Sequence, residues 1–158
     1  MRITRQTEYW KALLSGLLLL LLVSGCTVQY VSRYDEATEQ SITTIQRSVE
    51  TLLQSIHHNL GTPDAAYEHY ASTYEQLHVD AALLKTRAQA IDLNSITAEQ
   101  SELLLGWLKN LEELHKTGFD EAEMLIIVGG QARQIFVAML KFELAKKRQL
   151  EPAIINEE

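Results

Sequence analysis

The feature that most constrains the fold of this chain is the spacing of its apolar residues, which recur every three or four positions through four long segments. Residues with this spacing lie on one face of an α-helix. The chain has only two prolines, and no segment of useful length alternates in the way that is typical of a strand. The longest run has eight positions: Tyr67, Tyr70, Tyr74, Leu77, Ala81, Leu84, Ala88 and Ile91. The pattern predicts an all-α protein.

Three further segments carry the same pattern, and their apolar stripes predict the rest of the core. The first helix is expected over about 34–60, the third from 97 to about 117, and the fourth from about 120 to 150. Their predicted core positions are Ile42, Ile45, Val49, Leu52 and Ile56 in the first, Leu104, Trp107, Leu111 and Leu114 in the third, and Leu125, Val128, Ala132, Ile135, Met139 and Phe142 in the fourth.

Helix-ending and helix-starting residues separate these segments. Gly61 and Gly118 suit the left-handed conformation that follows a helix. Thr62-Pro63-Asp64 predicts the start of the second helix, with proline at its first position, and 97–100 fits a capping box for the third. Pro152 is expected to end the fourth. The short connections favour antiparallel neighbours, which gives an up-down-up-down four-helix bundle over 34–150 and a flexible acidic tail over 151–158. Apolar stripes of this kind also pair between chains, so the pattern is equally compatible with a homo-oligomer.

The N-terminal segment has a different character. Arg2, Arg5 and Lys11 precede a leucine-rich run over 12–23, which is too short for an ordinary transmembrane helix of about 20 residues. The run ends in Val23-Ser24-Gly25-Cys26, with the only cysteine of the chain. This arrangement resembles the type II signal peptide, or lipobox, of bacterial lipoproteins. The rest of the chain is only loosely similar to small helical lipoproteins of unknown function.

The resemblance implies a lipid anchor. In that family the thiol that matches Cys26 receives a diacylglycerol, the chain is cut before it, and the new amino group is acylated. Residues 1–25 are then a signal peptide, and 26–33 are the anchor and a short tether. No other cofactor is expected. In lipoproteins of enteric-type bacteria, an aspartate after the lipidated cysteine favours retention in the inner membrane. This chain has Thr27 at that position, so we expect the protein to be anchored on the periplasmic face of the outer membrane.

Charge and cysteine content set further limits. The segment 26–158 has 11 basic and 20 acidic residues, a net charge of about −9. Such a chain is a poor nucleic-acid ligand, because phosphate contacts need a basic face. With Cys26 acylated, no thiol remains for a disulfide. Lys146, Lys147 and Arg148 suit the C-terminus of the fourth helix, and contact with lipid phosphates at the membrane-proximal end is the alternative.

Two groups of residues are considered as metal ligands, and neither is favoured. The topology places His57, His58, His69 and His115 at the end of the bundle far from the anchor, where we expect them to face water separately. The pairs Glu75-x-x-His78 and Glu112-x-x-His115 have the spacing used in di-iron bundles, with Glu50 and Glu143 as conceivable partners. The stripes, however, predict that Glu75 and Glu112 point outward.

One level of the predicted core is unusual, because the adjacent Gly129 and Gly130 lie inside a helix, where each costs about 1 kcal/mol relative to alanine. We expect Tyr70, Tyr74 and Trp107 at the same height. Packing of these aromatic rings over the glycines is the simplest interpretation. A cavity for a small apolar or aromatic ligand is the alternative.

The sequence contains no Gly-x-Ser-x-Gly elbow, phosphate-binding glycine loop or His-Glu-x-x-His motif. We therefore expect a non-enzymatic interaction or structural module, anchored in the membrane and bound to an envelope protein. The alternative is a sensor bundle that binds a small ligand or a metal.

Overall fold

The computed structural model describes residues 30–119 and 122–154, and the described residues form an all-α fold. Its elements, in chain order, are α2 (Glu36–Asn59), the short 3-10 helices η1 (Pro63–Ala65) and η2 (Tyr67–His69), α3 (Ala71–Ala90), α4 (Ser95–Thr117) and α5 (Ala122–Ile154). All of these described helices belong to one compact unit, Val31–Glu158. The predicted signal peptide and Cys26 lie outside the described residues, as do 155–158 of the predicted tail.

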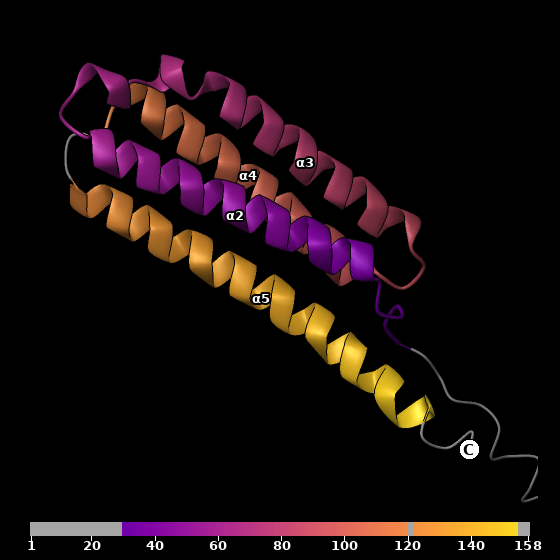
Figure 1. Ribbon diagram of the computed structural model, residues 1–158. Helices are drawn as coiled ribbons and strands as arrows, with labels where there is room; N and C mark the ends of the chain where they lie inside the picture. The colour runs from indigo at the N-terminus through magenta and orange to yellow at the C-terminus, as the bar shows by residue number, and fades with distance from the viewer. Residues whose placement is uncertain (1–29, 120–121, 155–158) are drawn as a thin grey trace, which may run out of the picture. The chain divides into compact units, whose positions relative to one another are not determined.

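Figure 1 shows α3 beside α4 and α2 beside α5. Helix α2 also contacts α3, and α4 contacts α5, which closes the bundle. The boundary between α3 and α4 is the most extensive, and that between α4 and α5 is the smallest of the four. This is the predicted up-down-up-down four-helix bundle, and the prediction is confirmed. Short connections leave consecutive helices antiparallel, so each apolar stripe faces the same central core.

The core follows the predicted stripes most closely in α2 and α3. All five predicted positions of α2 are buried, together with Leu53, and α3 buries Tyr74, Leu77, Ala81, Leu84 and Ala88. A fully buried aliphatic side chain contributes about 1.5–3 kcal/mol, so these stripes supply a large part of the stability. The N-terminus of α2 is capped by Asp35, whose carboxylate accepts from the Thr38 backbone N–H at 3.1 Å and is held by Arg87 of α3.

The predicted start of the second helix is wrong. Thr62-Pro63-Asp64 leads into 3-10 turns rather than an α-helix, and Ala66 between them is extended at φ −67° and ψ 144°. The α-helix begins only at Ala71. The Thr62 hydroxyl donates back to the carbonyl of Asn59 at 2.7 Å instead of capping a new helix. This turn carries Tyr67 and Tyr70 to the end of the core, against which both pack.

The predicted start and stripe of the third helix also need correction. Helix α4 begins at Ser95, two residues before the expected capping box, and Thr97 is fully buried within its first turn. Leu108 is buried, whereas Trp107 and Leu114 are only partly buried at the edge of the core. The buried stripe is Thr97, Ser101, Leu104, Leu108, Leu111 and His115. Because three members of this stripe are polar, the spacing of the apolar residues alone did not predict which face of α4 is buried.

Helix α5 differs from its prediction in a similar way. Phe136, Glu143 and Lys146 are buried, while Ile135 and Phe142 are partly buried. The helix also continues to Ile154, past the predicted end at 150, with Pro152 inside its last turn. Because proline has no N–H to donate, the last turn of α5 lacks one helical hydrogen bond there.

The segment Ala122–Gln149 of α5 is also long and apolar enough to cross a membrane, by length and composition alone. A core helix in a soluble protein passes the same test. The hydropathy arises because α5 carries apolar residues on its outer surface in addition to its core stripe. Ile126, Ile127, Val137 and Leu144 are all exposed.

Candidate functional site

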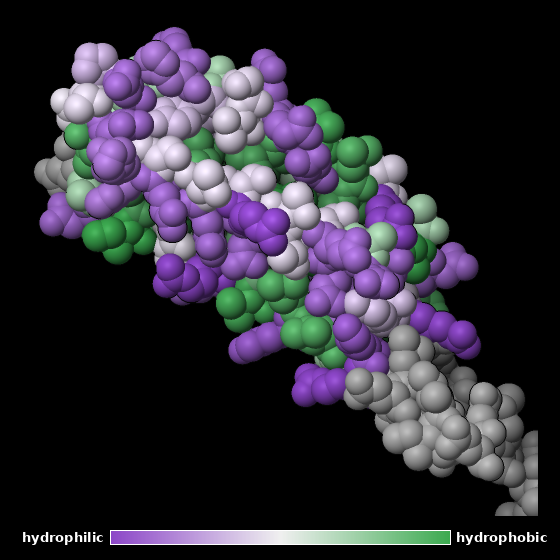
Figure 2. Space-filling model, in the orientation of Figure 1, coloured by the Kyte–Doolittle hydropathy of each residue, from purple (hydrophilic) through white to green (hydrophobic). Residues whose placement is uncertain are grey.

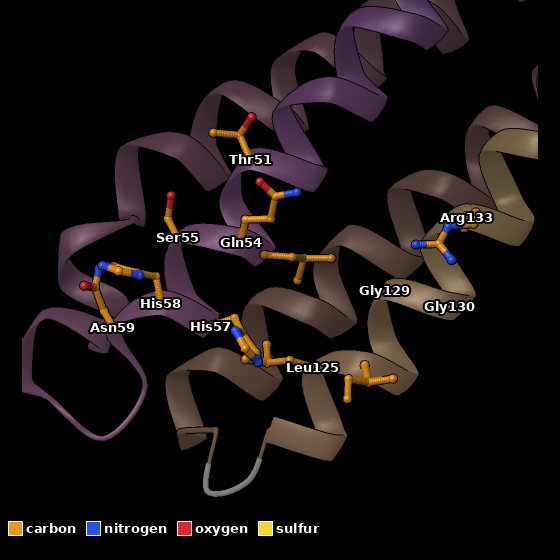
Figure 3. Close-up of a pocket in the computed structure, with 12 residues that line it drawn as sticks. Thr51, Gln54, Ser55, His57, His58, Asn59, Leu125, Gly129, Gly130 and Arg133 are labelled. Atoms are coloured by element: carbon orange, nitrogen blue, oxygen red, sulfur yellow. The ribbon is translucent and has the colours of Figure 1, made fainter.

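A surface depression of about 860 Å³ lies between α2 and α5 (Figure 3). A second depression of about 170 Å³ shares Leu53, Gln54, Gly129 and Arg133 with it and extends it along the two helices toward Phe136. Figure 3 shows His57 and Leu125 near one end of the groove and Arg133 near the other. We call this continuous surface the α2/α5 groove.

The glycine pair lies in the wall of this groove. A Cβ atom on Gly129 would lie 3.8 Å from Cδ1 of Leu53, an ordinary van der Waals contact, and one on Gly130 would meet nothing within 4 Å. Packing inside the bundle therefore requires neither glycine. Because two glycines within a helix together cost about 2 kcal/mol relative to alanine, the open space above them is the feature that needs explanation.

The aromatic residues predicted beside the glycines lie elsewhere. The groove is lined by α2 and α5, whereas Tyr74 and Trp107 belong to α3 and α4, and Tyr70 precedes α3. The predicted packing of these rings over the glycines is thus wrong, because a Cβ on either glycine would meet none of them within 4 Å. The cavity predicted among the five residues stays a prediction. The sequence singled out the glycines correctly as unusual, but it placed the wrong helices opposite them.

A second apolar stripe runs along α5 at the edge of the groove. Ile126, Gly130, Arg133, Val137, Leu140 and Leu144 follow one another at alternating steps of four and three residues, so they share one helix face. The exposed fractions are 67% for Ile126, 41% for Val137 and 43% for Leu144. Figure 2 shows hydrophobic patches along the α5 edge of the molecule, separated by hydrophilic side chains.

The charge on this part of the molecule differs from that on the rest. Residues 125–148 include five basic residues and one acidic residue, whereas 30–124 include six basic and sixteen acidic residues. Arg133 and Lys141 are exposed and form no ion pair with any described residue. The groove itself is lined by one basic residue, Arg133, and one acidic residue, Glu50. An apolar stripe with a basic border therefore lies on an otherwise acidic molecule.

The histidines predicted at the far end of the bundle do not form one site. His57, His58 and His69 are exposed, as expected, but His115 is buried, which corrects the prediction that it faces water. Its Nε2 lies 2.8 Å from the carbonyl oxygen of Ala65, which only accepts. Nε2 therefore carries the proton, and Nδ1 accepts from the Tyr74 hydroxyl at 3.0 Å. Burial raises the pKa of Tyr74, which keeps this donor protonated.

The two Glu-x-x-His pairs do not form one site, although Glu112 of one pair contacts His78 of the other. Glu75 is exposed, as predicted, but the prediction that Glu112 points outward is wrong. Its carboxylate accepts from the Tyr67 hydroxyl at 2.7 Å and lies 2.8 Å from His78 Nε2 and 3.0 Å from Lys116 Nζ. Partial burial opposes ionisation, but these hydrogen bonds outweigh it and lower the pKa of Glu112 to about 2. Glu112 thus joins α3 to α4.

Glu50 and Glu143 were considered as partners of these pairs. Glu50 is exposed, and Glu143 is buried. Among the described residues, no three His, Cys, Asp or Glu side chains converge in a geometry that would hold a metal ion.

The basic cluster at the end of α5 is not uniformly exposed. Lys147 and Arg148 reach solvent, but Lys146 is 3% exposed. Its Nζ donates to Asn94 Oδ1 at 2.6 Å, Thr97 Oγ1 at 3.0 Å and Glu143 Oε1 at 2.8 Å. The Ser32 hydroxyl donates to the same Asn94 oxygen at 2.9 Å. The alternative in which Lys146 contacts lipid phosphates is therefore wrong, because its charge is enclosed in the bundle.

Comparison with protein-family models, curated proteins and solved structures gives no match to this chain. The fold and the groove together define a helical bundle with one apolar, basic face that has no partner within the described chain.

Proposed function

We propose that this protein is a lipid-anchored, non-enzymatic interaction module of the bacterial envelope. The anchor is supported by the N-terminal sequence, in which a basic segment, a leucine-rich run and Val23-Ser24-Gly25-Cys26 follow one another. Two acyl chains suffice for stable membrane attachment, since each buried CH₂ contributes about 0.8 kcal/mol. In this proposal Cys26 is lipidated, and the bundle is held on the periplasmic face of the outer membrane.

The interaction role rests on one observation, the exposed stripe of α5 beside the α2/α5 groove. A helix with apolar residues on two faces has two surfaces to bury, and the core accounts for only one of them. Exposed apolar residues in a contiguous arrangement mark interaction sites. Ile126, Val137 and Leu144 share one face of α5 with Leu140, and Arg133 is the charged residue that divides this line.

The first experiment tests the anchor in cells that produce the full chain. We expect Cys26→Ser to abolish labelling by radioactive palmitate and to leave an uncleaved precursor. The matched control is Ser24→Ala, which keeps a small residue in the motif and should be labelled and cleaved normally. Equal labelling of the Cys26→Ser variant and the parent would contradict the proposed anchor.

The second experiment tests the interaction. Formaldehyde treatment of intact cells should convert part of the chain into a discrete adduct that contains another envelope protein. If the chain remains entirely uncrosslinked or forms only adducts with itself, the proposed interaction with an envelope protein is wrong.

A further inference from the structure

We propose that the α2/α5 groove binds an amphipathic helix with acidic flanks, supplied by the protein partner. This inference rests on the proposed interaction function and specifies the surface and the chemistry of the partner. Recognition of a helix in a groove uses apolar anchors spaced along one helix face. The groove, the open glycine pair and the charge of α5 each point to such an occupant.

The dimensions of the stripe favour a helix over a small molecule. Ile126 and Leu144 are 18 residues apart, which corresponds to about 27 Å along a helix axis at 1.5 Å per residue. Gly130 and Val137 lie between them on the same face. A small ligand would cover one turn of this stripe, whereas a helix of about 18 residues would cover all of it.

The glycine pair explains how such a helix can come close. Because the Cβ position on Gly130 is open and that on Gly129 makes only one contact, the backbone of α5 is accessible at this level. Glycine is the residue that permits close approach of another group to the backbone. A bulky anchor of the partner helix fits above Gly130, between the side chains of Ile126 and Arg133.

Charge decides which kind of helix fits. Arg133 lies within the stripe and Lys141 and Arg148 lie beside it, each without an ion pair to any described residue. Glu50 is the one acidic side chain that lines either depression. Complementary potentials give an interface its specificity and its rate of association, so the flanks of the partner helix are acidic.

The same observations disfavour two other occupants. The α5 face of a second copy carries the same positive charge, so two α5 stripes would repel each other. An anionic bilayer would attract the basic residues, but it is planar, whereas the apolar stripe borders a depression walled by α2. Both occupants are distinct outcomes of the following experiment.

The experiment uses the full chain in intact cells, with the photocrosslinker p-benzoylphenylalanine placed at Ile126 of α5 or at Gln54 of α2, both of which line the groove. Leu83 of α3, which is 62% exposed, is the control position away from the groove. We expect both groove positions to capture the same protein, through a peptide with apolar residues at steps of three and four and with net negative charge. Leu83 should not capture this peptide.

Two pairs of matched variants test whether the groove itself is responsible. Gly130→Leu fills the open space, and Gly106→Leu changes an exposed glycine of α4 whose Cβ position is equally open. Arg133→Glu reverses a groove charge, and Lys109→Glu makes the same change on α4. We expect Gly130→Leu and Arg133→Glu to reduce the crosslinked product at least tenfold, while both controls retain it. Changing the nearest acidic residue of the captured peptide to lysine should restore capture by Arg133→Glu.

Several results would overturn the proposal. They are crosslinks from the groove positions to lipid, to a second copy of the chain or to a peptide without acidic residues, and equal losses in the matched controls. If Leu83 captures an envelope protein and the groove positions do not, the groove assignment fails while the interaction function stands. If no position captures a protein, both fail.

Discussion

Lys146 and Glu143 form a buried ion pair one turn apart on α5, with Nζ and Oε1 separated by 2.8 Å. Thr97 and Asn94 supply the other hydrogen-bond partners of the ammonium group. The second carboxylate oxygen, Oε2 of Glu143, is buried with no hydrogen-bond partner in the described structure. The pair therefore fixes the rotation of α5 against α4, although its own contribution to stability is reduced by desolvation.

This arrangement predicts unequal effects of single and double substitutions. Lys146→Met leaves the Glu143 carboxylate buried without its counter-ion, so we expect a loss of about 3–5 kcal/mol in the free energy of unfolding. In Glu143→Leu/Lys146→Met both charges are absent, and most of that loss should be recovered. Urea unfolding of the full chain in mild detergent, followed by circular dichroism, measures both. A double variant as unstable as the single one would show that the pair is not the cause.

A second prediction concerns the hydrogen bond between Tyr74 and His115 at the other end of the bundle. Tyr74→Phe leaves Nδ1 of His115 buried without a donor, so we expect a loss of about 1–3 kcal/mol in the free energy of unfolding. Tyr70→Phe is the matched control, because the Tyr70 hydroxyl is only partly buried where it accepts from Asn59. Its removal should cost less. Equal losses would mean that the hydroxyl of Tyr74 contributes nothing specific.

These two polar pairs also show where prediction from sequence reached its limit. The buried stripes of α2 and α3 are apolar except for Thr38 at the start of α2, and their periodicity identified the apolar buried positions. In α4 and α5, buried Thr97, His115 and Lys146 interrupt the apolar pattern. Each is buried because a partner on another element satisfies it, and a pattern within one helix carries no information about that partner.

The candidate site was predictable only in part, for the same reason. The cost of two adjacent glycines within a helix is a property of the sequence, and it identifies Gly129 and Gly130 as unusual without any knowledge of their neighbours. Which helix lies opposite depends on the rotation of α5, which the buried Glu143 and Lys146 help to determine. The rotation of α5 also leaves Arg133 exposed, without an ion pair to any described residue. The basic bias of 125–148 is present in the sequence and is the signal that a segment-by-segment charge count would have detected.

A third prediction concerns acid stability and the carboxylate of Glu112. Hydrogen bonds from Tyr67, His78 and Lys116 outweigh desolvation and lower its pKa to about 2 in the folded state, whereas an unfolded glutamate titrates near 4.3. The unfolded state therefore binds this proton first as the pH falls. The stabilisation is complete above about pH 4.5 and is lost progressively down to about pH 2.

We therefore expect the free energy of unfolding to fall less between pH 5 and pH 2 in Glu112→Gln than in the parent. Glu113→Gln is the matched control, because it removes an exposed carboxylate that contacts the same Lys116 at 3.0 Å and leaves Glu112 in place. It should retain the pH dependence of the parent. Urea titrations at a series of pH values test this, and the same slope in all three proteins would contradict the assignment to Glu112.

The last prediction concerns the membrane in which the proposed anchor resides. The resemblance to bacterial lipoproteins gives the residue after the lipidated cysteine a sorting role, and Thr27 occupies that position. Thr27→Asp leaves Cys26 and the described bundle unchanged, so we expect normal palmitate labelling but a shift of the chain from the outer to the inner membrane on a sucrose gradient. Thr27→Ser is the control and should remain with the outer membrane. If the parent already sediments with the inner membrane, the proposed location is wrong even though the anchor at Cys26 can still hold.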